Sequence, residues 1–378
     1  MKSQTWKLLP LMFGFFIMGF VDVIGIAISH IKLDFQLSDS IVNTIPFFGF
    51  IWFLFLSVPT GMLMNRIGRK KTVLLSFIIQ VVALVLPLIR YDFGFMLVAF
   101  ALLGIGNTLL QVALNPLVSN VVSPDRLTST LTLGQFVKAI CSFLGPILTA
   151  AVVGSFLGWK MIFPIYGLLS LLATVWLACT PIAETQPESK NSSIGSILGL
   201  LKDRYILLLF LGITVLVGAD VGMNITLPKY LMERCSLEIN EAGLGNSLYF
   251  FSRTAGAFLG ALLLLRLSAR HFFIWSVILA LGGLVITLLF GNLWAILAGV
   301  ILFGLGYANL FSIIFSYALQ YRSDQANEIS SLLIMGVFGG AILPPILGVV
   351  SDSLDQWAAM ALLALVWLYL FSLFHKLR

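Results

Sequence analysis

Residues 8–28 read LLPLMFGFFIMGFVDVIGIAI, an apolar run that contains a single acid, Asp22. A stretch of about 20 apolar residues is long enough for a helix to cross the hydrocarbon core of a bilayer. The run is longer than the apolar part of a secretory signal peptide, and such a part does not carry an acid. Residues 8–30 are therefore predicted to form a first membrane span rather than a cleavable leader.

The composition of the whole chain extends this prediction to a multi-pass membrane protein. Of the 378 residues, 60% are hydrophobic and only 10% are charged, and the mean hydropathy is +1.05. A soluble domain needs about a quarter of its residues charged. We predict an all-α membrane protein with twelve spans, near residues 8–30, 41–64, 72–89, 93–119, 129–156, 161–180, 205–231, 241–265, 272–291, 293–319, 328–350 and 356–375.

The longest polar interval, residues 184–193, divides these spans into two sets of six. We expect an N-terminal bundle over 1–182, a cytoplasmic linker over 183–204 and a C-terminal bundle over 205–378. With both termini in the cytoplasm, fifteen of the 22 Lys and Arg residues face that side and five face the other. This bias follows the positive-inside rule, and it explains the basic charge without a nucleic-acid partner. We expect a monomer in the cell membrane.

Two apolar segments about 200 residues apart each contain one acid, Asp22 in the first and Asp220 in the second. The surrounding residues are MGFVDVIG (18–25) and VGADVG (217–222). Duplicated membrane halves with an ionisable residue near mid-bilayer depth are typical of secondary transporters. The sequence therefore predicts two pseudo-symmetric six-helix bundles with a polar site between matching helices.

Four charged residues are expected inside spans: Asp22, Asp220, Lys138 and Arg253. Helical rise places both acids about 20 Å from the cytoplasmic entry, near the midplane. Two acids and two bases cancel, which favours a paired network that rearranges between conformational states. A second interpretation is that Arg253 grips an anionic group of the substrate. A third is that the charges are purely structural, and the sequence leaves all three open.

Uncharged polar residues supply candidates for binding the solute. Amide groups both donate and accept hydrogen bonds, which matches the hydroxyl groups of a sugar. Trp52 lies in mid-span, where its ring could stack on an apolar sugar face. For each residue taken alone, packing between helices is the simpler explanation. The candidate substrate-binding residues are Trp52, Asn107, Gln111, Gln135, Asn224, Tyr249 and Asn309.

The loop after the second expected span reads GMLMNRIGRKK (residues 61–71). It resembles the major facilitator superfamily signature, in which a glycine is followed by D-R-x-G-R-[RK]-[RK]. The resemblance implies a gating loop at the cytoplasmic face. The aspartate of the signature is Asn65 here, so a neutral hydrogen bond is expected where the family acid steadies the closed inner gate. The implied gating residues are Gly61, Asn65, Arg66, Gly68 and Arg69.

Further stretches resemble the fucose–proton symporter branch of that superfamily. QVALNP (111–116) is similar to the branch pattern E-T-A-A-N-P, and GGAILPP (339–345) is similar to G-G-[AG]-I-[IV]-P. The resemblance implies a sugar or sugar-derived substrate. The branch glutamate proposed to carry the proton is Gln111 here and cannot titrate. Proton coupling is therefore not inherited, and sodium coupling or uniport stay open.

No catalytic site is expected from this sequence. The three histidines lie at span ends without a partnered nucleophile, and neither a phosphate-binding loop nor a metal-ligand cluster is visible. We expect no cofactor and no bound metal, with H⁺ or Na⁺ acting only as the coupling ion. The expected function is secondary active transport of a small polar solute by alternating access. The alternatives are a proton-driven drug or metabolite exporter, a flippase for lipid-linked substrates and a non-transporting receptor.

Overall fold

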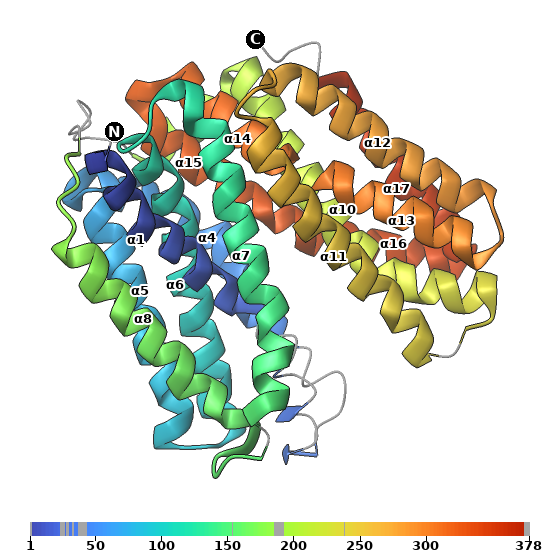
Figure 1. The fold of residues 1–378 in the computed structure, drawn as a ribbon, viewed down its shortest axis with the longest axis horizontal. Coiled ribbons are helices and arrows are strands. Elements are labelled where there is room, and N and C mark those ends of the chain that lie inside the picture. The colour runs from blue at the N-terminus through green and yellow to red at the C-terminus, as the bar shows by residue number, and fades with distance from the viewer. Residues whose placement is uncertain are drawn as a thin grey trace. The chain divides into compact units, whose positions relative to one another are not determined.

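The computed structural model describes residues 2–22, 27, 30–31, 34–36, 44–152, 154–184, 193–237 and 239–373. Within these ranges the regular elements are α-helices and short 3₁₀ turns (Figure 1). An all-α membrane protein is what the composition predicts, because helices satisfy all their backbone hydrogen bonds internally in lipid.

Ten helical stretches of the described chain are long and apolar enough to cross a bilayer. Each overlaps one of the twelve expected spans. They are Phe47–Ile67, Arg69–Ile89, Phe93–Ser119, Pro124–Gly145, Gly158–Cys179, Arg204–Cys235, Ala269–Leu289, Leu293–Tyr321, Ser323–Ser351 and Gln356–Leu373.

The other two expected spans coincide with helices that fall short by different measures. The first, α1 (Lys2–Met18), continues into the 3₁₀ turn η1 (Gly19–Asp22), and its apolar part is only Trp6–Met18. Much of the remainder of the expected span 8–30 lies outside the described residues. The second, α11 (Ile239–Leu263), has 25 residues. Its length suffices, but polar residues such as Asn246 and Arg253 lower its mean hydropathy.

The chain forms two compact units, and the first comprises Met1–Leu127, Gly134–Leu198 and Arg322–Met335. In this unit α6 packs on both α4 and α5, and α8 packs on α5. Apart from α1 and η1, its elements are α4 (Thr44–Ile67), α5 (Arg69–Ile89), α6 (Phe93–Ser119), most of α7 (Pro124–Val152), η2 (Gly158–Met161), α8 (Ile162–Cys179), most of α9 (Ile194–Gly199), η4 (Ser323–Gln325) and α15 (Ala326–Met335).

The second unit comprises Thr128–Leu133, Gly199–Tyr321 and Gly336–Arg378. Here α10 packs on α11, α16 and α17, while α12 packs on α13 and α17. Besides α11 and the short piece of α7, its elements are η3 (Leu200–Lys202), α10 (Arg204–Cys235), α12 (Ala269–Leu289), α13 (Leu293–Tyr307), α14 (Leu310–Tyr321), η5 (Gly336–Phe338), α16 (Gly339–Ser353) and α17 (Gln356–Leu373).

Neither unit is one continuous piece of chain. Residues 322–335, which include α15, group by contact with the N-terminal helices, and residues 128–133 of α7 group with the C-terminal helices. These contact-based units differ from the two expected bundles, 1–182 and 205–378, by these two short segments, and the bundle boundaries stay a prediction.

Polar residues before the apolar runs determine where three helices begin. The side chain of Asp92 accepts a hydrogen bond from the Phe95 backbone N–H (2.9 Å) at the start of α6. Asp203 and Asn292 do the same at the starts of α10 and α13. Such caps satisfy backbone donors that have no partner within the helix.

The eleventh expected span is broken into α15 and α16 by the 3₁₀ turn η5. Gly336, the first residue of this turn, and Gly339, the first residue of α16, both lie against α10. A Cβ atom on Gly339 would overlap the Thr214 carbonyl oxygen, and one on Gly336 would lie 3.0 Å from Thr214 Oγ1. Small residues allow such close approach between membrane helices.

Replacing Gly339 by alanine is expected to destabilise the protein. The new methyl group would meet the backbone of α10, and overpacking of this kind costs about 1–3 kcal/mol. Thermal unfolding of the purified protein in detergent would measure the loss. Gly348→Ala in the same helix is the matched control, because nothing lies within 4 Å of its Cβ position. Equal losses in the two variants would contradict the packing argument.

Candidate functional site

Asp220 lies in the middle of α10 and is 9% exposed. Arg253 on α11 donates from Nη1 to both of its carboxylate oxygens, at 2.9 Å to Oδ1 and 2.8 Å to Oδ2. A buried charge without a partner costs several kcal/mol, so each member of this ion pair removes the penalty of the other. The structure thus places together two of the four charged residues expected inside spans.

Two tyrosines complete the surroundings of the carboxylate. The Tyr249 hydroxyl donates to Asp220 Oδ1 at 2.5 Å, and Tyr307 of α13 also forms a side-chain hydrogen bond with Asp220. The guanidinium carbon of Arg253 lies 5.0 Å from the centre of the Tyr307 ring, a favourable cation–π distance. Because Tyr249 precedes Arg253 by four residues, both side chains leave the same face of α11.

Close packing between α11 and α13 supports this arrangement. A Cβ atom on Gly304 would lie 3.0 Å from the Tyr249 carbonyl oxygen and 3.2 Å from the Arg253 backbone nitrogen. Beyond Tyr249, the rings of Phe303 and Trp367 lie 5.0 Å apart between centres, and Trp367 Nε1 donates to the Val277 carbonyl oxygen. The ion pair is therefore supported by a packed aromatic layer.

Two asparagines extend the polar site along α10 and α11. Asn224 Nδ2 lies 3.4 Å from the Asp220 carbonyl oxygen, and Asn246 Nδ2 donates to the Asn224 carbonyl oxygen at 2.9 Å. The Oδ1 atoms of both asparagines are buried and lack a hydrogen-bond partner within the described part of the chain. Buried polar atoms normally have partners, so two acceptors beside the ion pair can receive hydroxyl groups or water.

A separate set of unpaired polar atoms lies in the first unit. Trp52 Nε1 and both polar side-chain atoms of Asn107 are buried without a partner among the described residues. Gly104 of α6 packs on the backbone of Gly49 in α4, and Asn107 and Trp52 follow three residues later in their helices. Trp52 and Asn107, both predicted as binding residues, therefore offer two hydrogen-bond donors and one acceptor near the contact between α4 and α6.

The two charged residues expected in the N-terminal half are only partly placed. Lys138 is half-buried on α7. Asp22 ends η1, but its side chain lies outside the described residues. A Cβ atom on Gly19 would lie 2.8 Å from the Lys138 carbonyl oxygen, so η1 contacts the backbone of α7 at Lys138.

Other predicted binding residues make ordinary helix contacts. Gln111 is buried, and its carbonyl oxygen accepts from Asn115 Nδ2 at 2.8 Å. Gln135 is half-buried on α7. Asn309 donates from Nδ2 to the Gly256 carbonyl oxygen at 3.0 Å and is buried against α11. Its Oδ1 atom is buried without a hydrogen-bond partner among the described residues, as are those of Asn224 and Asn246, so Asn309 stays a candidate contact as well as a packing residue.

The predicted gating loop contacts α15 within the first unit. Asn65 Nδ2 donates to Glu328 Oε1 at 2.5 Å, and Asn327 Nδ2 donates to Asn65 Oδ1 at 2.6 Å. Arg69 Nε in turn donates to Asn327 Oδ1 at 2.6 Å. Gly61 allows α4 to approach, since a Cβ atom there would lie 2.6 Å from Ser331 Oγ.

The rest of the loop is anchored to neighbouring helices of the same unit. Arg69 Nη1 donates to Asn120 Oδ1 at 2.6 Å. Gly68 has a φ of 92°, which favours glycine, and this turn lets the backbone N–H groups of Arg69 and Lys70 donate to the Glu184 carboxylate. Arg66 is exposed.

The expectation of a neutral hydrogen bond at Asn65 describes only the one that it accepts from Asn327, because Asn65 also donates to the buried carboxylate of Glu328. The acid that the signature places on the loop is supplied here by α15. Sequence reasoning missed Glu328, although an acid at the start of an apolar span was a usable signal. It also missed Tyr307, which no motif distinguishes from the many aromatic residues of the chain.

Asn65→Asp is expected to destabilise the contact between the loop and α15. A second carboxylate beside Glu328 would replace a charge-assisted hydrogen bond, worth about 1.5–3 kcal/mol, with repulsion. Adding Glu328→Gln should restore stability, because the double variant again pairs one acid with one amide. Thermal unfolding in a double-mutant cycle measures this coupling.

Asn292→Asp is the control for that cycle. It changes an exposed amide to an acid at a helix cap, where both residues are equally suitable, so unfolding should not change. Additive losses in the two variants at positions 65 and 328 would show that the residues do not act on each other.

Comparison with known proteins assigns the family. The sequence pattern of the Major Facilitator Superfamily matches residues 11–239. The chain belongs to the Major Facilitator Superfamily. It is therefore a multi-pass membrane transporter of the secondary type and not an enzyme, and its resemblance to the sugar branch is confirmed.

Several transporters of this superfamily align along nearly the whole chain. A glucose/galactose transporter of Brucella abortus is 27% identical over 392 residues, covering 98% of this chain and 93% of that protein. A putative glucose/galactose transporter of Helicobacter pylori is 25% identical over 401 residues, covering 100% and 97%. The crystal structure of the Escherichia coli fucose:proton symporter superposes with a TM-score of 0.86 at 17% identity, covering 98% of each chain. That structural likeness shows the fold.

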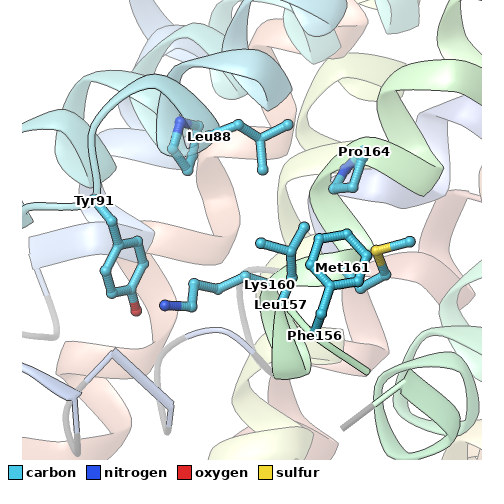
Figure 2. Close-up of a pocket in the computed structure, with 8 residues that line it drawn as sticks. Leu88, Tyr91, Phe156, Leu157, Lys160, Met161 and Pro164 are labelled. Atoms are coloured by element: carbon cyan, nitrogen blue, oxygen red, sulfur yellow. The ribbon is translucent and has the colours of Figure 1, made fainter. Parts of the chain in front are cut away.

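A further polar cluster in the first unit of this transporter surrounds Asp34. The Asp34 carboxylate accepts from the Tyr91 hydroxyl at 2.5 Å and from Trp159 Nε1 at 3.0 Å. Lys160 Nζ lies 3.9 Å from the centre of the Tyr91 ring. Figure 2 shows Tyr91 and Lys160 at a pocket whose other labelled residues, such as Leu88 and Phe156, are apolar.

The cluster should make stability depend on pH through Asp34. Burial raises the pKa of Asp34, but the hydrogen bonds from Tyr91 and Trp159 and the charge of Lys160 outweigh it and leave the pKa lowered. A lowered pKa contributes stability that is present above the pKa of the unfolded chain, about 3.9. That stability is lost as the pH falls through the folded value.

Asp34→Asn is expected to lower the unfolding temperature at pH 7. The gap to the natural protein should narrow as the pH falls below about 4, because the natural carboxyl group then becomes neutral too. Thermal unfolding of both proteins across this pH range provides the measurement. A gap that is independent of pH would show that the charge of Asp34 is not involved.

Proposed function

We propose that this transporter moves a small polar solute, a sugar or sugar derivative, by alternating access coupled to a cation gradient. The observation that carries the proposal is the neutral Asp220–Arg253 pair bordered by the unpaired oxygens of Asn224 and Asn246. A polar cluster with paired charges and unpaired hydrogen-bond acceptors suits an uncharged solute rich in hydroxyl groups. The names of the glucose/galactose transporters that align with the chain support the same class.

The first unit holds a second set of candidate contacts for the solute. Trp52 and Asn107 carry buried polar atoms without partners in the described ranges, and a bound sugar would give them partners. Trp52 adds an apolar ring that can stack on the less polar face of a pyranose. We place Gln111 and Gln135 as further contacts of this half.

Coupling would act through the acids at mid-span. Gln111 does not titrate, so a proton or Na⁺ needs another carboxylate. A cation that reaches Asp220 competes with Arg253 for the carboxylate. If the Asp220–Arg253 pair is intact in one conformational state and broken in the other, ion binding is linked to the change of conformation. Asp22 is the second candidate, with Lys138 as its proposed partner.

The orientation follows from the distribution of basic residues. We propose twelve spans in two six-helix bundles, with both termini in the cytoplasm. We further propose that the protein is a monomer in the cell membrane. In this orientation the loop 61–71 and α15 lie at the cytoplasmic end. Their contact through Asn65 and Glu328 would then be an inner gate that opens during transport.

Transport in proteoliposomes tests the proposal. Purified protein should accumulate labelled glucose or galactose when an H⁺ or Na⁺ gradient is imposed, and collapse of that gradient should abolish accumulation. Asp220→Asn and Asp22→Asn should each prevent accumulation while leaving the protein folded. Asp125→Asn, an exposed acid at the start of α7, is the matched control and should transport normally.

Three results would contradict parts of the proposal. Normal accumulation by Asp220→Asn would remove this acid from coupling. Equilibration without accumulation would indicate uniport. Failure to move any sugar, combined with increased sensitivity of deletion cells to toxic compounds, would favour an exporter.

A further inference from the structure

We propose that the pocket between the end of α5 and the start of α8 binds a membrane phospholipid, with the lipid phosphate on Lys160 and part of an acyl chain on the apolar wall. This inference does not depend on the transported solute, because none of the residues that line the pocket is a candidate solute contact. It assigns a lipid site to a part of the fold that has no role in the proposed transport cycle.

The wall of the pocket is mostly apolar. Its residues come from the end of α5, the loop after it, and the segment that leads through η2 into α8. The volume of about 370 Å³ falls within the usual range for small-ligand sites. Six of the eight lining residues are apolar, namely Pro87, Leu88, Phe156, Leu157, Met161 and Pro164.

The pocket lies where two helices reach the end of their apolar stretches. Leu88 belongs to the last turn of the stretch Arg69–Ile89, and Lys160 lies in the first turn of the stretch Gly158–Cys179. In a bilayer this is the level at which hydrocarbon gives way to headgroups. Leu88 is 41% exposed and Phe156 is 86% exposed, so the apolar wall is open at the surface. A lipid is the molecule that an open apolar wall meets at this depth.

Lys160 supplies the polar end of the pocket. Its half-buried side chain extends towards Tyr91, and Nζ lies 3.9 Å from the centre of the Tyr91 ring (Figure 2). An ammonium group has three hydrogen-bond donors, and none of them reaches an acceptor within the described ranges. The carboxylate of Asp34 accepts from Tyr91 and Trp159 instead. Unused cationic donors beside an apolar wall match a phosphate attached to an acyl chain.

The surrounding charges favour recognition of the phosphate itself over the net charge of the lipid. Lys160 acts on the opposite charge of Asp34, and Arg90 pairs with Asp92 at 2.6 Å. These four charges cancel and therefore exert little attraction on a distant anion. Hydrogen bonds from Lys160 act only at contact, where every glycerophospholipid presents a phosphate. Anionic and zwitterionic phospholipids should both bind, and lipids without phosphate should not.

Thermal unfolding of the full-length protein in detergent, after removal of co-purified lipid, tests this site. Dioleoyl phosphatidylglycerol and dioleoyl phosphatidylcholine, each added at several times its dissociation constant, should raise the unfolding temperature by about 2 °C or more. Monogalactosyl diacylglycerol has two acyl chains but no phosphate, and it should raise the temperature much less. Inorganic phosphate should have no effect, because it lacks an acyl chain.

Variants separate the phosphate contact from the apolar wall. Lys160→Gln should lose the advantage of the phospholipids over the galactolipid, whereas Lys160→Arg keeps the charge and the donors and should retain it. Leu88→Trp fills the pocket from its exposed side and should reduce the shift from either phospholipid. Lys229→Gln is the matched control. It removes an exposed lysine of α10 that does not line the pocket, so it should respond like the natural protein.

Any of four results would overturn the inference. They are equal shifts from lipids with and without phosphate, a full phospholipid shift in Lys160→Gln, a response to phosphatidylglycerol alone, and a comparable shift from inorganic phosphate. If Lys160→Gln folds poorly, Leu88→Trp still decides the question. An unchanged phospholipid shift in Leu88→Trp would show that the lipid does not occupy this pocket.

Discussion

An ionised side chain inside a membrane protein needs an opposite charge and hydrogen-bond partners, because the hydrocarbon around it offers neither. In the second unit this requirement joins α10 to α11 through Asp220 and Arg253. Gly304 of α13 packs against the turn of α11 that carries Arg253. The rings of Phe303 and Trp367 pack behind this turn and support the same contact. Much of the local architecture thus follows from one carboxylate placed where water is scarce.

The same requirement applies at the loop between α4 and α5. Glu328 of α15 is 5% exposed. It accepts a hydrogen bond from the side-chain amide of Asn65, which belongs to a different helix, α4. Both buried acids are therefore satisfied across a helix boundary. Contacts of this kind form or break as units when helices move. This property suits a protein that alternates between two arrangements.

The sequence predicts the elements of this protein better than their partners. Apolar run lengths and caps such as Asp92 locate the helices, because both signals are local. The spacing of Asn246, Tyr249 and Arg253 indicates one face of α11, but nothing local tells which helix that face meets. The break at Gly336 arises from contact with α10, and the acid opposite Asn65 comes from a residue more than 200 positions away. Such features depend on tertiary packing.

The packing of α15 on α4 and α6 has a consequence for biosynthesis. A ribosome completes residues 1–198 long before it reaches residues 322–335, yet both belong to the first unit. The N-terminal helices must therefore wait in the bilayer, with the surface that receives α15 uncovered, until most of the chain has been translated. Completion of the surface formed by α4 and α6 is in this way tied to the synthesis of α15.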